Sequence, residues 1–92
     1  MNHTAFKARV YGIVQGVGYR FFTRDAARRY GITGYVKNMP DGSVEVYAEG
    51  EKAFLEEFLK DLHQGPFSAV VEKVDVEWLP PKENLSDFSI RF

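Results

Sequence analysis

Cysteine is absent from the 92 residues of the chain, and histidine occurs only twice. Without a thiol, the protein cannot form a disulfide bond, a thiolate nucleophile or a thiolate metal site. His3 lies near the start of the chain and His63 near the end of an expected helix, and neither has a partner at the spacing of a metal site or a catalytic triad. The sequence therefore predicts no metal site.

An excess of charge of either sign and long apolar runs are also missing. Lys and Arg number 12 against 13 Asp and Glu, so the formal net charge is -1. A general attraction to nucleic acid or to an anionic membrane would require a marked basic excess. No stretch has the length and apolarity of a membrane span, and the polar N-terminal residues do not resemble a signal peptide. We expect a cytoplasmic protein that binds neither nucleic acid nor membranes.

The composition that remains is that of an ordinary globular protein, with 45% hydrophobic and 15% aromatic residues. A chain of this length lies near the small end of the range that folds without disulfides or metals. No internal repeat, linker or low-complexity tract interrupts it. The sequence predicts a single domain over residues 1–92.

Hydrophobic periodicity divides the chain into alternating strands and helices. A period of two predicts strands over residues 6–13, 32–38, 43–49 and 70–78, and a short extra strand at 88–92. Helical spacing predicts one helix before Gly31 and a second between Gly50 and Gln64. This βαββαβ order is typical of the ferredoxin-like split βαβ sandwich, an α+β fold in which two helices cover one face of an antiparallel sheet.

Two glycines, Gly16 and Gly18, lie where the first strand gives way to the first helix. Glycine adopts positive φ at low cost, so such a turn can direct successive N–H groups into one concavity. The helix N-terminus and Arg20, with its planar fork of donors, would add to a phosphate cradle. A Gly-x-Gly at a strand end is also common as a plain tight turn, and the run lacks the Gly-Lys-Ser/Thr of nucleotide triphosphate loops and the third glycine of dinucleotide sites.

The expected topology brings Asn38 to the same edge of the sheet as this turn. The first two strands run in the same direction on either side of the third, so their carboxyl ends lie roughly 10 Å apart. Arg20 and Asn38 can therefore face one small anion site from two sides. A turn-forming role for Asn38 before Pro40 is the alternative.

Together these residues resemble the two adjoining sequence patterns of the acylphosphatase family, and the resemblance covers the whole chain. Tyr19 and Tyr35 stand where the family often has Phe and Trp, a difference that concerns packing. The matching residues are Gly12, Ile13, Val14, Gln15, Gly16, Val17, Gly18, Tyr19, Arg20, Ala27, Gly31, Ile32, Gly34, Tyr35, Val36, Asn38, Asp41, Gly42, Val44, Glu45 and Gly50.

The resemblance implies hydrolysis of small-molecule acyl phosphates to a carboxylate and inorganic phosphate, by a monomer without a metal or another cofactor. It implies that Arg20 binds the phosphate and that Asn38 positions a water for in-line attack. Inorganic phosphate or another oxyanion would compete for the site. The backbone N–H groups expected to form the cradle are those of Gln15, Gly16, Val17, Gly18, Tyr19 and Arg20.

Two non-catalytic functions are alternatives. Ferredoxin-like sandwiches also serve as RNA-binding modules that display aromatic and basic residues on the open sheet face. The second alternative is a phosphate-binding module that keeps the cradle without turnover, as part of a larger enzyme. The strand pattern predicts that the open face carries Lys7, Arg9, Tyr11 and Tyr47, together with Glu45 and Glu49.

Overall fold

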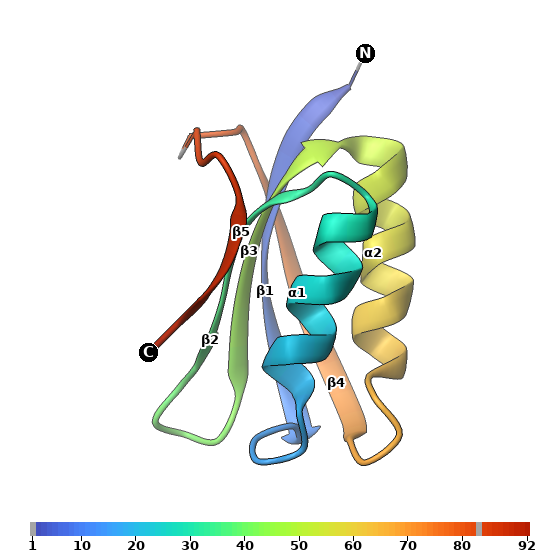
Figure 1. The fold of residues 1–92 in the computed structure, drawn as a ribbon, viewed down its shortest axis with the longest axis vertical. Helices are drawn as coiled ribbons and strands as arrows, with labels where there is room; N and C mark the ends of the chain where they lie inside the picture. The colour runs from blue at the N-terminus through green and yellow to red at the C-terminus, as the bar shows by residue number, and fades with distance from the viewer. Residues whose placement is uncertain (1, 83) are drawn as a thin grey trace.

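The computed structural model describes residues 2–82 and 84–92. In strand β1 (His3–Ile13), buried and more exposed residues alternate from Phe6 to Val10. Phe6, Ala8 and Val10 of β1 are buried in the core, as their spacing predicts. The Phe58 ring packs between two others, with its centroid 6.1 Å from that of Phe6 and 5.9 Å from that of Phe88. The core therefore lies between the sheet and the helices (Figure 1).

The remaining strands are β2 (Thr33–Asn38), β3 (Val44–Glu51), β4 (Val70–Leu79) and β5 (Phe88–Arg91), in the sheet order β4-β1-β3-β2-β5. All strands begin and end within three residues of the predicted bounds. The first four strands form the expected antiparallel sheet. The short extra strand β5 pairs with β2 in parallel, so the complete sheet is mixed.

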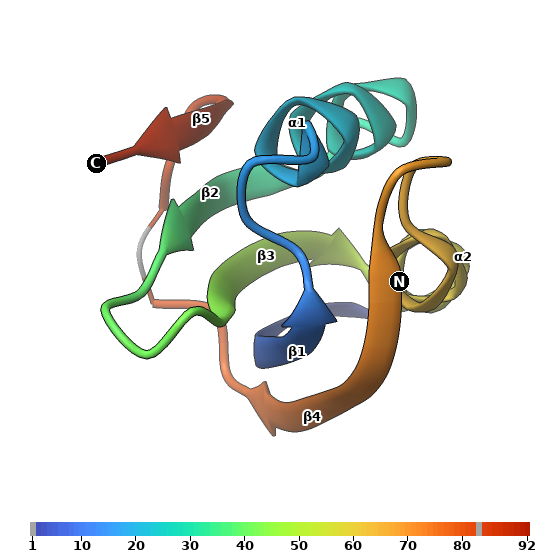
Figure 2. The ribbon, with the colours of Figure 1, turned by 90° about the horizontal axis from the view of Figure 1, so that it is seen from below.

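Helix α1 (Tyr19–Arg29) and helix α2 (Lys52–Gln64) pack on the same face of the sheet (Figure 2). Gly31, with φ of 67°, follows α1 in the predicted capping position, and the N–H of Ile32 donates to the carbonyl of Ala27 at 3.0 Å. Neither helix is long and apolar enough to cross a membrane, and no other helix occurs in the described parts of the chain. The arrangement is the predicted ferredoxin-like one.

The opposite face of the sheet is partly covered, which the sequence did not predict. The chain must pass from β4 at one edge to β5 at the other, and the described parts of this connection, residues 80–82 and 84–87, place the N–H of Lys82 and the side chain of Leu85 against the open face. Tyr47 and Glu49 are only 4% exposed, and the N–H of Lys82 donates to Glu49 Oε2 at 3.0 Å. The assignment of Tyr47 and Glu49 to an exposed face was therefore wrong.

Tyr19 joins the start of α1 to the end of α2. Its hydroxyl donates to the carbonyl of Leu62 at 2.7 Å, and its side chain is 1% exposed. Residue 66 is proline, which has no N–H to donate, so the Leu62 carbonyl has no partner four residues along the helix. Burial raises the pKa of the Tyr19 phenol, which keeps the hydroxyl protonated as a donor.

We expect Tyr19→Phe to lower the free energy of unfolding by about 1–3 kcal/mol, because it leaves the buried Leu62 carbonyl without a donor. A domain of this size loses roughly 4–8 °C in Tm for each kcal/mol. Urea and thermal unfolding of the two proteins measure the difference. Tyr11→Phe is the matched control, since no hydrogen bond of the Tyr11 hydroxyl occurs among the described residues. Equal stability of the Tyr19→Phe variant and the parent would contradict the assigned cap.

Candidate active site

The loop that joins β1 to α1, residues 14–18, is here named the cradle loop. Gly16 and Gly18 have φ of 75° and 80°, a left-handed conformation that residues with a side chain rarely adopt. Gly18 is the N-cap of α1, where no side chain caps the helix and the first turn holds no acidic residue. The first turn therefore presents N–H groups without a side-chain acceptor, at the positive end of the helix dipole.

A pocket of about 160 Å³ opens at this loop and receives residues from three elements. Arg20 comes from the first turn of α1 and Asn38 from the last position of β2, so the predicted meeting of these two residues is observed. None of the lining residues is acidic. The complete lining consists of Val14, Gly16, Gly18, Tyr19, Arg20, Phe21 and Asn38.

Arg20 carries the positive charge of this pocket. Arg9, Arg24, Arg28 and Arg29 each lie within ion-pair distance of an Asp or Glu, whereas no carboxylate in residues 2–82 and 84–92 lies that close to Arg20. Its guanidinium carbon lies 5.2 Å from the ring centroid of Phe92. A guanidinium without an anionic partner can donate two parallel hydrogen bonds to a phosphate.

The side chain of Asn38 has a buried acceptor in the same pocket. No donor among the described residues reaches its Oδ1 atom, although that atom is shielded from solvent. Such an atom costs free energy unless a ligand or a water donates to it. The turn-forming role belongs to Asp41 instead, because its carboxylate accepts from the N–H of Ser43 at 3.0 Å. The hydrogen bonds from Ser43 lower the pKa of Asp41.

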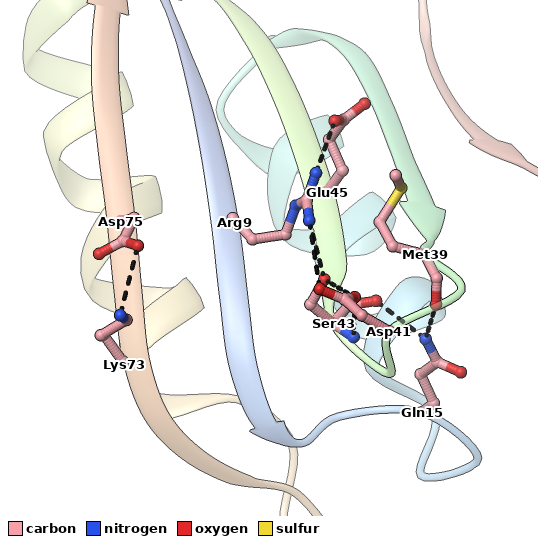
Figure 3. A network of polar contacts seen from close by, with 8 residues as sticks. All are labelled: Arg9, Gln15, Met39, Asp41, Ser43, Glu45, Lys73 and Asp75. Atoms are coloured by element: carbon pink, nitrogen blue, oxygen red, sulfur yellow. Dashed lines mark hydrogen bonds and ion pairs between the residues drawn. The ribbon is translucent and has the colours of Figure 1, made fainter.

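Gln15 connects the cradle loop to the turn after Asn38 (Figure 3). Its Nε2 atom donates to the carbonyls of Met39 and Ser43 at 2.8 and 2.9 Å. On the other side of the turn, Nη1 of Arg9 lies 3.6 Å from Oδ2 of Asp41 and donates to Oγ of Ser43 at 3.3 Å. The cradle loop and the turn that follows Asn38 are therefore joined by direct hydrogen bonds.

The sequence prediction and the pocket differ in several residues. Neither Gln15 nor Val17 lines the pocket, and Val17 packs against the core instead. Sequence reasoning placed only the backbone of Gln15 in the site and did not anticipate the hydrogen bonds of its side chain. It also missed Phe21, although its position directly after Arg20 at the helix start was a usable signal.

Metal-binding side chains are not gathered at this pocket. In the described ranges of the chain, no group of three or more His, Cys, Asp or Glu side chains is placed to hold a metal ion. The groups available for chemistry at the pocket are one guanidinium, one amide and the main-chain donors. These groups suit binding of a tetrahedral anion and orientation of a water beside it.

Comparison with known proteins gives a family for the chain. The sequence profile of the acylphosphatase family matches residues 6–90. An acylphosphatase from Thermotoga petrophila is 51% identical over 88 residues, which are 96% of this chain and 97% of that protein. The crystal structure of acylphosphatase from Bacillus subtilis has a TM-score of 0.94 at 34% identity, covering 97% of this chain and 99% of that one.

A much longer protein contains a similar fold. The crystal structure of full-length HypF in the phosphate- and nucleotide-bound form has a TM-score of 0.91 at 29% identity. The similarity covers 99% of this chain and 12% of that one. The same fold therefore occurs both as nearly the whole of a small protein and as a small part of a large one.

Proposed function

The chain belongs to the acylphosphatase family, and we propose that it hydrolyses acyl phosphates to a carboxylate and inorganic phosphate in the pocket that Arg20 and Asn38 line. The observation that carries this proposal is that Arg20 and Asn38 line one pocket. The guanidinium of Arg20 has no carboxylate partner in the described part of the chain. A bound phosphate supplies the anion that this guanidinium lacks.

In the proposed reaction, a water oxygen attacks phosphorus in line with the acyl oxygen. The bond between phosphorus and the acyl oxygen breaks, and its electron pair leaves with the carboxylate. Arg20 and the N–H groups of the cradle loop hold the phosphate oxygens and stabilise their charge. The side-chain amide of Asn38 holds the water by a hydrogen bond and fixes its direction of attack.

The protons of this reaction need no strong acid or base from the protein. A carboxylate is a weak base and leaves without protonation. Asn38 cannot take a proton at neutral pH, so a phosphate oxygen of the substrate accepts the proton that the water loses. Positioning and charge stabilisation then supply most of the rate, without a metal ion.

The proposal has further parts besides the reaction. Inorganic phosphate, the product, competes with the substrate for Arg20 and the cradle loop. We include in the proposal that residues 1–92 act as one domain, that the protein is a monomer and that it works in the cytoplasm.

Of the two non-catalytic alternatives, RNA binding has the weaker support. Lys82 and Leu85 contact Tyr47 on the open sheet face, and the aromatic side chain of Tyr47 is 4% exposed. A buried ring cannot stack on a base. The other alternative, phosphate binding without turnover, uses the same pocket and is distinguished by a measurement of turnover.

The deciding experiment incubates the purified protein with benzoyl phosphate in the presence of a metal chelator and follows release of inorganic phosphate. We expect turnover that the chelator does not abolish. Binding of phosphate with no release of benzoate would instead identify a non-catalytic module. Salt-dependent retention of RNA without turnover would support the RNA-binding alternative.

Gln15 allows a milder prediction. We expect Gln15→Leu to lower kcat/KM for benzoyl phosphate about tenfold, because the cradle loop loses its two hydrogen bonds to the turn after Asn38. Small misplacements of positioning groups cost up to about 10²-fold in rate. Gln64→Leu, at the exposed end of α2, is the matched control. Kinetics equal to those of the parent in both variants would show that these hydrogen bonds do not position the site.

A further inference from the structure

An exposed aromatic side chain stands at the pocket. Phe21 lines the pocket together with Arg20 and Asn38, and its side chain is 55% exposed. The guanidinium carbon of Arg24 lies 5.2 Å from the centroid of its ring. Phe21 is therefore held on the first turn of α1 while much of its apolar surface remains open to a ligand in the pocket.

A second aromatic ring, that of Phe92, lies beside the guanidinium of Arg20. Strand β5 runs parallel to β2, back toward the carboxyl end where Asn38 lies, and so it carries Phe92 to Arg20. The Phe92 ring is 95% exposed, and its centroid lies 5.2 Å from the guanidinium carbon. One largely exposed phenyl ring, that of Phe21, therefore lines the pocket, and another, that of Phe92, lies beside Arg20.

The pocket is too small to hold a whole acyl phosphate of appreciable size. Its volume is about 160 Å³, whereas pockets that enclose drug-sized ligands measure about 300–1,000 Å³. In-line attack by a water at Asn38 requires the acyl group to leave on the side of phosphorus away from that water. With the phosphate at Arg20, an extended acyl chain would reach the mouth of the pocket, where Phe21 is exposed.

We propose that Phe21 forms an apolar subsite for the acyl group and makes the enzyme select extended aliphatic or aromatic acyl phosphates over acetyl phosphate. The inference rests on the proposed function and names the substrate class of that same site. An apolar acyl chain removes phenyl surface from water when it binds, whereas an acetyl group is too short to do so.

The test compares kcat/KM for hexanoyl and acetyl phosphate, two substrates whose carboxylate leaving groups have similar basicity. Their ratio therefore reports on contacts of the chain and not on leaving-group chemistry. We expect Phe21→Ala to lower the hexanoyl-to-acetyl ratio about tenfold, the discrimination that one or two buried methylene groups provide. Phe21→Gln is a second variant, in which a polar residue that favours helix formation replaces the phenyl ring.

Phe67→Ala is the matched control, because this ring is fully exposed and does not line the pocket. It should leave the ratio unchanged, and inhibition by inorganic phosphate should be equal in the Phe21 variants and the parent. Turnover of both substrates with the same ratio in folded Phe21→Ala and Phe21→Gln would overturn the subsite and leave the hydrolase assignment standing. Absence of turnover of either substrate by the parent protein would overturn both.

Discussion

Replacement of Arg20 with alanine is expected to lower kcat/KM for benzoyl phosphate by at least about 10²-fold, a loss on the order of 3 kcal/mol or more of transition-state stabilisation. We expect this loss because no other side chain in the pocket can take over the role of Arg20. No other arginine or lysine lines the pocket, and Arg20 itself has no carboxylate partner in residues 2–82 and 84–92. The variant should also bind inorganic phosphate more weakly, because the same fork holds substrate and product.

One further variant separates the charge of Arg20 from its geometry, and another serves as the control. Arg20→Lys keeps a positive charge without the planar fork, so we expect only partial recovery over alanine. Arg29→Ala, at the far end of the same helix, removes an arginine that pairs with Asp61 and should retain activity close to that of the parent. Steady-state kinetics, with circular dichroism to verify folding, measure all three. An Arg20→Ala variant as active as Arg29→Ala would rule out the assigned role.

Asn38→Ala is expected to produce a different kinetic signature. Its principal effect should be a fall in kcat by about 10² to 10³-fold, the range seen on loss of one precisely placed polar group. Binding of inorganic phosphate should change little, because Asn38 is assigned to the water and Arg20 to the phosphate. Initial rates over a range of substrate concentrations, together with phosphate inhibition constants, separate the two effects.

For Asn38→Ala we also expect an effect on stability that differs from the effect of replacing a residue with a purely structural role. The Oδ1 atom of Asn38 is buried without a donor among the described residues, and such an atom destabilises the folded state. Its removal should leave the free energy of unfolding unchanged or raise it by up to about 1 kcal/mol, while activity falls. Loss of stability and activity together, with phosphate binding also lost, would indicate that Asn38 supports the turn and does not position the water.

Much of this site could be predicted from the sequence because local patterns determine it. The alternating and helical segments fix the order of strands and helices, and that order brings the ends of β1 and β2 to one edge of the sheet. Gly16 and Gly18 predict positive φ from residue type alone, and both adopt it. Arg20 and Asn38 meet in one pocket as a consequence of topology.

The features that could not be predicted depend on contacts between distant residues. Burial of Tyr47 and Glu49 follows from the path of residues 80–82 and 84–87, whose composition indicates a loop but not which face it covers. The parallel pairing of β5 with β2 results from that same crossing. The hydrogen bonds of Gln15 join residues 24 and 28 positions apart, and no periodicity reports such a contact.

The hydroxyl of Tyr19 has a consequence for motion in this protein. It connects the residue directly before Arg20 to the last turn of α2, 43 positions along the chain. Segments joined by a buried hydrogen bond tend to open and close as one cooperative unit. The anion-holding end of α1 is thus tied to a neighbouring helix, and it cannot separate from that helix without breaking a buried hydrogen bond.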